Sequence, residues 1–158
     1  MGSTASPEAA QSAIDAPTDQ SLRVPCYCEE NVWRLTVRKT TERAGEMDFY
    51  VVFVTNPEKC VPMFHQLASR DPERPCFWDY HVLLFGVCRK SGKTTVFDID
   101  SRLPYPCELK EYLLQVFPPE IVWKEKFKPC FRVISAGKYI EHFSSDRMHM
   151  YDKETKSW

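Results

Sequence analysis

Three long apolar runs constrain the fold of this chain more than any other feature of its sequence. They are residues 48–55 (DFYVVFVT), 77–88 (FWDYHVLLFGVC) and 94–100 (TTVFDID). Each run is rich in the aromatic and β-branched residues that favour strands, and the KSGK turn at residues 90–93 joins the last two into a predicted hairpin. The first two are almost continuously apolar, as central strands are. We therefore expect a mostly antiparallel sheet.

A helical period precedes the first of these runs, over residues 28–38. Its apolar members share one narrow arc and its charged members lie opposite, with Cys28, Val32 and Leu35 set against Glu30, Arg34 and Arg38. Further helical spacing covers residues 109–117 and one or two turns at 138–143, and residues 130–135 form a short predicted strand. The predicted fold class is α+β, with the N-terminal helix packed on the sheet.

The first 23 residues differ in composition from the rest. They are rich in Ala, Ser, Thr, Pro and Asp, which predicts a flexible tail over residues 1–23. The remaining residues, 24–158, have the length of one domain. Apolar residues make up 43% of the chain and aromatic residues 13%, so the body of the chain is expected to bury a core.

Charge, hydropathy and cysteine usage exclude several classes of function. The net charge of −1 comes from interspersed charges of both signs, so no nucleic-acid surface is expected. No apolar run reaches membrane-spanning length and no signal peptide precedes the seven cysteines, which predicts reduced thiols in the cytoplasm or nucleus. The C-x-C spacing of Cys26 and Cys28 does not suit zinc, and no metal or other cofactor is expected.

The sequence offers one candidate for each role in a cysteine-nucleophile site. Cys28 would begin the first helix, where the dipole and free N–H groups stabilise a thiolate, although the neighbouring carboxylates oppose this. His81 lies within the second strand as a candidate base. Asp98 and Asp100 share one strand face, and either could orient the imidazole. The alternatives are a buried structural cysteine, a core histidine with satisfied hydrogen bonds, and a solvated or turn-capping aspartate pair.

Several motifs in order give the chain a resemblance to a known family. They are CYCEEN at residues 26–31, WDYHV at 78–82, FDID at 97–100, LPYPC at 103–107 and SDRMHM at 145–150. In these segments the chain closely resembles the protein N-terminal glutamine amidohydrolases, and the match runs from about Cys26 to Trp158. Several long motifs in the correct order are far more specific than one short pattern.

The resemblance implies a papain-like or transglutaminase-like cysteine hydrolase fold and a monomeric enzyme without cofactors. It implies a triad of Cys28, His81 and Asp98 that deamidates the N-terminal glutamine of protein substrates to glutamate. The implied reaction releases ammonia through a thioester intermediate and feeds the N-degron degradation route. A terminal residue also needs acceptors for its α-ammonium, and Glu30 and Asp79 are the candidates that adjoin the motifs.

Two departures from the family pattern leave other readings open. Phe97 stands where the pattern has tyrosine, and family members usually continue beyond the position of Trp158, so the C-terminal part of the family domain is expected to be missing. One alternative is a catalytically inactive, shortened form that binds N-terminal glutamine or a partner. Another is a thiol protease or transglutaminase-like acyl transferase, which would act on internal peptide bonds or incorporate amines.

Overall fold

The computed structural model describes residues 19–143 of the chain. The helical elements in this range are α2 (Cys28–Glu42), α3 (Leu109–Val116), α4 (Ala136–His142) and the 3-10 turn η1 (Glu125–Phe127). The strands are β1 (Met47–Thr55), β2 (Val61–Met63), β3 (Cys76–Trp78), β4 (Tyr80–Cys88), β5 (Thr94–Phe97), β6 (Cys107–Glu108) and β7 (Cys130–Ser135).

The main sheet has five strands in the order β6-β5-β4-β1-β7, and every neighbouring pair is antiparallel. The two long apolar runs became β1 and β4, which lie inside the sheet as their hydrophobicity predicts. Strands β2 and β3 form a separate two-stranded sheet. The predicted α+β class, with an N-terminal helix on a mostly antiparallel sheet, is confirmed.

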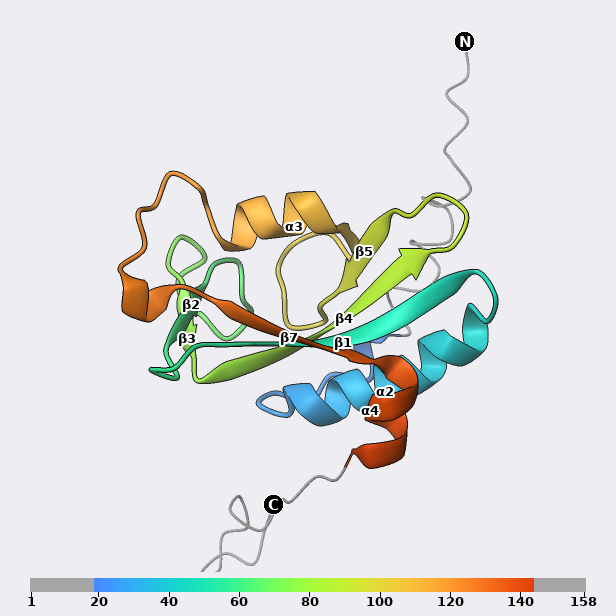
Figure 1. Cartoon of the computed structure of the whole chain (residues 1–158). Coiled ribbons are helices and arrows are strands. Elements are labelled where there is room, and N and C mark those ends of the chain that lie inside the picture. The colour runs from blue at the N-terminus through green and yellow to red at the C-terminus, as the bar shows by residue number, and fades with distance from the viewer. Residues whose placement is uncertain (1–18, 144–158) are drawn as a thin grey trace, which may run out of the picture.

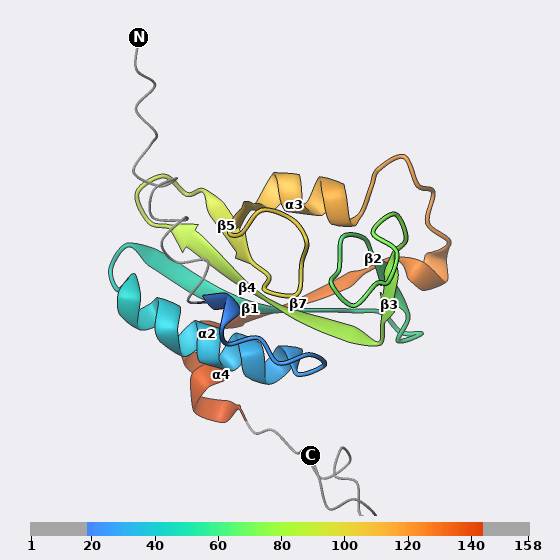
Figure 2. The same ribbon diagram turned by 180° about the vertical axis from the view of Figure 1, so that it is seen from behind.

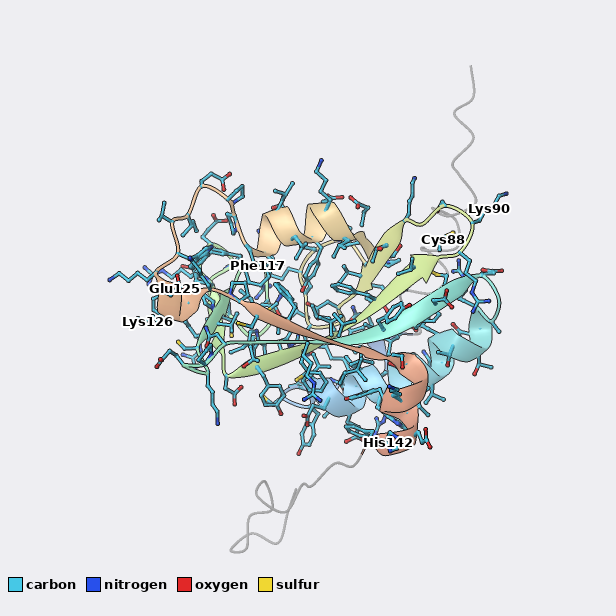
Figure 3. All side chains as sticks on the ribbon, in the orientation of Figure 1. Cys88, Lys90, Phe117, Glu125, Lys126 and His142 are labelled. Atoms are coloured by element: carbon cyan, nitrogen blue, oxygen red, sulfur yellow. The ribbon has the colours of Figure 1, made fainter. Side chains whose placement is uncertain are left out.

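Helices cover both faces of the sheet. Helix α3 lies over one face, and α2 and α4 lie over the other (Figures 1 and 2). Successive side chains of a strand point to opposite faces, so Val51 of β1 joins the core under α2 and α4 while Val52 joins the core under α3. Figure 3 shows side chains filling the space between α3 and the sheet. The sheet therefore separates two apolar cores.

Helix α2 buries the arc that its sequence period predicts. Cys28, Val32 and Leu35 are all buried in the core on this face. The helix continues to Glu42, one turn beyond the predicted end, and its last turn contains Lys39, which is only 1% exposed. The ammonium of Lys39 lies 2.8 Å from the carboxylate of Asp19, so a residue distant in the sequence stabilises the extra turn.

Two predicted strands are shorter in the structure than in the prediction. The run at 77–88 is interrupted at Asp79, which accepts a hydrogen bond from the backbone of Tyr80 and separates β3 from β4. Strand β5 ends at Phe97, because Asp98 accepts a hydrogen bond from the backbone N–H of Asp100 and starts a turn. Polar side chains that bond their own backbone compete with strand pairing in this way.

Residues 19–23 differ from the prediction of a flexible tail. Asp19 is fully buried, Leu22 packs against the core under α2, and Arg23 pairs with Asp100 at 2.7 Å. These five residues belong to the packed body, while residues 1–18 of the expected tail and residues 144–158 lie outside the described range. No helix between residues 19 and 143 is long and apolar enough to cross a membrane.

Candidate active site

His81 and Asp98 meet between two adjacent strands of the main sheet. His81 is the second residue of β4, and Asp98 follows the end of β5, the strand that pairs with β4. The Nε2 atom of His81 lies 3.1 Å from Oδ1 of Asp98, and both residues are buried. The chain thus brings a base and an acid 17 residues apart into direct contact.

Asp98 is held by hydrogen bonds on both carboxylate oxygens. Oδ1 also accepts from the backbone N–H of Asp100 at 3.0 Å, and Oδ2 accepts from the Tyr112 hydroxyl at 2.6 Å and from Gln66 at 3.4 Å. Burial raises the pKa of Asp98, but His81 and these donors outweigh burial and lower the pKa below its ordinary value. Asp98 is therefore a fixed carboxylate.

Asp100 occupies a different environment. Its Oδ1 accepts a 2.7 Å hydrogen bond from Arg23, whereas its pKa is raised by burial and by the nearby charge of Asp98. The sequence pattern alone left Asp98 and Asp100 equivalent. The structure places Asp98 against the imidazole and gives Asp100 an arginine partner.

Cys28 is the first residue of α2, the helix that lies over the sheet face opposite α3 (Figures 1 and 2). It is 8% exposed. Asn31, fully buried in the first turn, exchanges two hydrogen bonds with the backbone of Val24 and so fixes the segment that leads to Cys28. In the described range the N-cap residue, Tyr27, makes no side-chain hydrogen bond to the first turn. N–H groups at this helix end are thus left for other acceptors.

The Cys28 thiol and the Asp98 carboxylate both act on His81. Burial lowers the pKa of His81, but the charge and hydrogen bond of Asp98, with a contribution from Cys28, raise the pKa to about 10. Nδ1 of His81 is buried and has no hydrogen-bond partner among the described residues, so it is open to a further partner. Hydrogen bonds in a substrate-free site are often long and tighten when substrate binds.

Trp78 fixes the imidazole from its flat side. The rings of Trp78 and His81 are stacked, with centroids 4.9 Å apart and planes inclined by 19°. Trp78 belongs to β3 and His81 to β4, and the break at Asp79 lets the chain turn the indole onto the imidazole. The WDYHV motif is thereby explained physically: its tryptophan packs on the histidine that follows three residues later.

His81, Asp98 and Asp100 also resemble a metal-ligand group. One ligand atom from each lies within 4.8 Å of the others, and all three residues are buried. Their hydrogen bonds argue against this reading, since both oxygens of Asp98 already have protein donors and Asp100 is paired with Arg23. The donor set fits a hydrogen-bonded acid and base better than a cation site.

The two predicted acceptors for a substrate ammonium are partly engaged by protein groups. Glu30 pairs with Arg34 one turn along α2. Oδ1 of Asp79 accepts a 2.8 Å hydrogen bond from the backbone N–H of Tyr80. The backbone carbonyl of Asp79 accepts another from the Thr55 hydroxyl.

Sequence reasoning missed two residues that support Asp98. In the sequence, Tyr112 is one apolar position of the helical period at residues 109–117, and Gln66 belongs to no recognisable pattern. Both are fully buried polar residues. A tyrosine on an otherwise apolar helix face was the available clue, because a buried hydroxyl needs a partner.

Comparison with known proteins assigns the chain to a family. The family model for N-terminal glutamine amidase matches residues 23–158, which is most of the chain. The chain belongs to the N-terminal glutamine amidase family. Cys28, His81 and Asp98 all lie within the matched range, as do the motifs that carried the resemblance.

Members of the N-terminal glutamine amidase family with curated names are similar along most of the chain. The protein N-terminal glutamine amidohydrolases of Danio rerio and Homo sapiens are each 37% identical over 137 residues, which is 86% of this chain and 67% and 66% of theirs. That of Drosophila ananassae is 39% identical over 128 residues, covering 80% of this chain and 62% of its own. The chain thus spans about two thirds of the length of the curated relatives it matches.

Proposed function

We propose that this chain deamidates the N-terminal glutamine of proteins, with Cys28 as nucleophile, His81 as acid and base, and Asp98 as the orienting acid. The observation that carries the proposal is the 3.1 Å contact of His81 with Asp98 in a member of this family, and Cys28 is among the groups that raise the His81 pKa. Relatives that match most of the chain are named protein N-terminal glutamine amidohydrolases, which supplies the substrate class.

The first half of the proposed reaction forms a thioester. The Cys28 sulfur, as thiolate, attacks the side-chain carbonyl carbon of glutamine and forms a C–S bond. N–H groups at the start of α2 can stabilise the resulting oxyanion, because the N-cap side chain leaves them uncapped in the described structure. His81 then gives its proton to the amide nitrogen, the C–N bond breaks, and ammonia departs.

The second half restores the enzyme. A water molecule gives one proton to His81 and attacks the thioester carbon, the C–S bond breaks, and glutamate remains on the substrate. Asp98 keeps the imidazole in the required orientation throughout and stabilises its protonated form. The net reaction consumes one water and releases one ammonia for each glutamine.

The wider context of the protein is part of the same proposal. We propose a single catalytic domain that includes residues 19–23 of the predicted tail, has a papain-like fold and acts as a monomer. A cysteine-bearing helix start packed near a strand histidine supports the papain-like assignment. Reduced thiols suit the cytoplasm or nucleus, where the new N-terminal glutamate would enter the N-degron route.

The test is ammonia release from a peptide with N-terminal glutamine, with an Asn-initiated peptide and an internal-glutamine peptide as substrate controls. We expect release from the first peptide alone. Cys28→Ala and His81→Ala should abolish it, whereas Cys130→Ala, which alters an exposed thiol on β7, should leave it unchanged. Cleavage of internal peptide bonds or amine incorporation would instead support a protease or acyl transferase.

The alternative to turnover is binding alone. A catalytically inactive form would bind N-terminal glutamine, or a partner, without turnover. It would release no ammonia from a folded sample, and its affinity for the Gln-initiated peptide would survive Cys28→Ala.

A further inference from the structure

An enzyme restricted to N-terminal glutamine must read a group that internal glutamine lacks. That group is the α-ammonium, whose natural partner is a carboxylate close to the nucleophile. The carboxylate that binds the α-ammonium lies outside the triad, and its assignment rests on the proposed function. The CYCEEN and WDYHV motifs contain three carboxylates: Glu29, Glu30 and Asp79.

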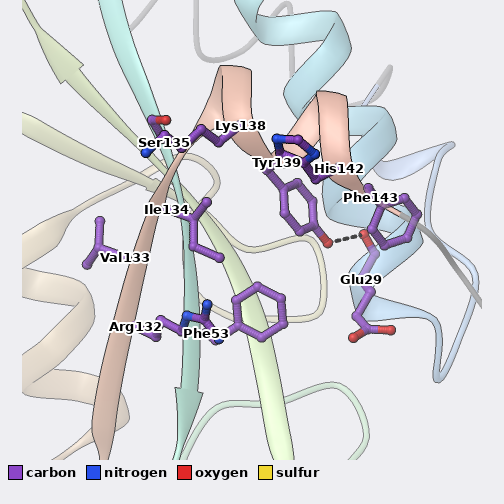
Figure 4. Close-up of a pocket in the computed structure, with 10 residues that line it drawn as sticks. All are labelled: Glu29, Phe53, Arg132, Val133, Ile134, Ser135, Lys138, Tyr139, His142 and Phe143. Carbon is purple, nitrogen blue, oxygen red and sulfur yellow. Dashed lines mark hydrogen bonds between the residues drawn. The ribbon is translucent and has the colours of Figure 1, made fainter.

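Glu29 is the one that faces a pocket. It follows Cys28 directly in the first turn of α2 and lines a pocket of about 670 Å³ between the start of α2, strand β7 and helix α4. Figure 4 shows the Glu29 side chain at one side of this pocket, with Phe53 and Tyr139 as neighbours. Neither Glu30 nor Asp79 lines it.

Two tyrosines connect Glu29 to the nucleophile. The Tyr80 side chain lies near the Glu29 side chain, whose charge raises the Tyr80 pKa, and Tyr80 belongs to the WDYHV motif, next to His81. Burial, then the nearby Glu29 and Cys28, raise the pKa of Tyr80 to about 12, and the same groups raise that of Tyr139 well above its ordinary value. Glu29, Cys28 and both tyrosines therefore share one neighbourhood.

The Glu29 backbone is also held in place. The Tyr139 hydroxyl donates a 3.1 Å hydrogen bond to the Glu29 carbonyl oxygen, which ties α4 to the start of α2 (Figure 4). Phe53 packs against both tyrosines, with ring centroids 6.4 Å from Tyr80 and 6.0 Å from Tyr139. A carboxylate on such a rigid support is preorganised for one ligand position.

The Glu29 carboxylate differs from those of Glu30 and Asp79 in the protein groups that it contacts. Within residues 19–143 Glu29 forms no ion pair, whereas Glu30 pairs with Arg34, and Asp79 accepts a hydrogen bond from the backbone N–H of Tyr80. Arg132 lines the same pocket but forms no ion pair with Glu29 among residues 19–143. A substrate cation would supply the missing partner.

We propose that the Glu29 carboxylate, held at the pocket wall beside Tyr80 and Tyr139, binds the α-ammonium of the substrate's first residue and restricts the reaction to chain termini. Glutamine bound in this way would extend its side chain toward the neighbouring residue, Cys28, which carries the nucleophile. The pocket beyond Glu29 would then take the substrate chain that follows.

The experiment compares two substrates on the full chain: a Gln-initiated peptide and an otherwise identical peptide whose first residue lacks the α-amino group. The unmodified chain should prefer the amine-bearing peptide in kcat/KM. Glu29→Gln should lower kcat/KM for that peptide by about 10- to 100-fold, mainly through KM, and leave the other peptide nearly unchanged. The preference for the free amine would then collapse.

Three carboxylate variants serve as comparisons. Glu141→Gln, which neutralises an exposed carboxylate on α4, should preserve the preference. Equal losses on both peptides in Glu29→Gln would overturn the proposal, because they would indicate a structural effect or an effect on the thiol. The proposal also fails if the preference collapses in Glu30→Gln or Asp79→Asn and persists in Glu29→Gln.

A binding measurement separates this proposal from the proposed function. Cys28→Ala removes turnover, so the affinities of both peptides can be measured by calorimetry with and without Glu29→Gln. A Glu29-dependent preference for the amine-bearing peptide supports the proposal even if the unmodified chain releases no ammonia. Ammonia release with an unchanged preference in Glu29→Gln overturns the role of Glu29 and leaves the amidase function standing.

Discussion

The hydroxyl of Tyr112 donates a 2.6 Å hydrogen bond to Asp98, on the carboxylate oxygen that His81 does not contact. Tyr112 lies on α3 and is 1% exposed, so the helix that covers one face of the sheet reaches directly into the candidate active site. This hydrogen bond holds Oδ2 of Asp98, while His81 contacts Oδ1 of the same carboxylate. It also means that the packing of α3 and the chemistry of the site are coupled.

Tyr112→Phe should therefore weaken both stability and activity. The ring fits the same space, but a buried carboxylate oxygen loses its shortest donor, which should lower the free energy of unfolding by about 1–3 kcal/mol. Losing a donor to the charged form also raises the pKa of Asp98, because that form is less stabilised. Urea denaturation and the acid limb of the pH–rate profile measure the two effects. An unchanged urea midpoint would contradict the contact.

Asp98→Asn should be far more damaging to turnover than Asp100→Asn. The amide removes the negative charge that stabilises a protonated His81 and can hold the wrong tautomer, so kcat should fall by about 10³- to 10⁴-fold. Asp100 contacts Arg23 instead, and its variant should mainly lose stability. Steady-state kinetics on a Gln-initiated peptide distinguish the two. Equal losses of kcat in both variants would argue against Asp98 as the orienting acid.

The His81–Asp98 pair predicts a specific dependence of stability on pH. The folded pKa of His81 is raised from 6.5 to about 10, so its contribution is complete below pH 6.5 and is lost as the pH rises toward 10. The folded pKa of Asp98 is lowered, so its contribution is present above the ordinary value of 3.8 and is lost in stronger acid. Urea midpoints across this range should decline above pH 6.5. In Asp98→Asn that decline should be much smaller.

Asp19→Ala should destabilise the fold although it lies outside the predicted core. Its carboxylate accepts from Lys39 at 2.8 Å and from the Tyr105 hydroxyl at 2.7 Å, and both Asp19 and Lys39 are almost completely buried. Removing it leaves a buried ammonium with poorer compensation, at a cost of about 3–5 kcal/mol. Glu46→Gln, which breaks the more exposed pair with Arg43, should cost less than about 1 kcal/mol. Thermal and urea unfolding of both variants provide the comparison.

Much of the fold could be predicted because its signals are local. The buried arc of α2, at Cys28, Val32 and Leu35, follows from a period of 3.6 residues, and the bounds of β7 are those predicted. The apolar runs of β1 and β4 marked the interior of the sheet. The roles of Cys28, His81 and Asp98 were expected from their motifs and remain predictions until the variants are measured.

The sequence by itself determined the principal helices and strands, the buried face of α2, and the family that the motifs belong to. Only the tertiary structure decided that Asp98 rather than Asp100 contacts His81, that Tyr112 supports that acid, and that Glu29 faces a pocket. The physical reason is that periodicity and propensity are properties of neighbouring residues. A contact between β4, β5 and α3 depends on strand register, on the turn at Asp98 and on how the helix packs over the sheet, and no local pattern encodes these.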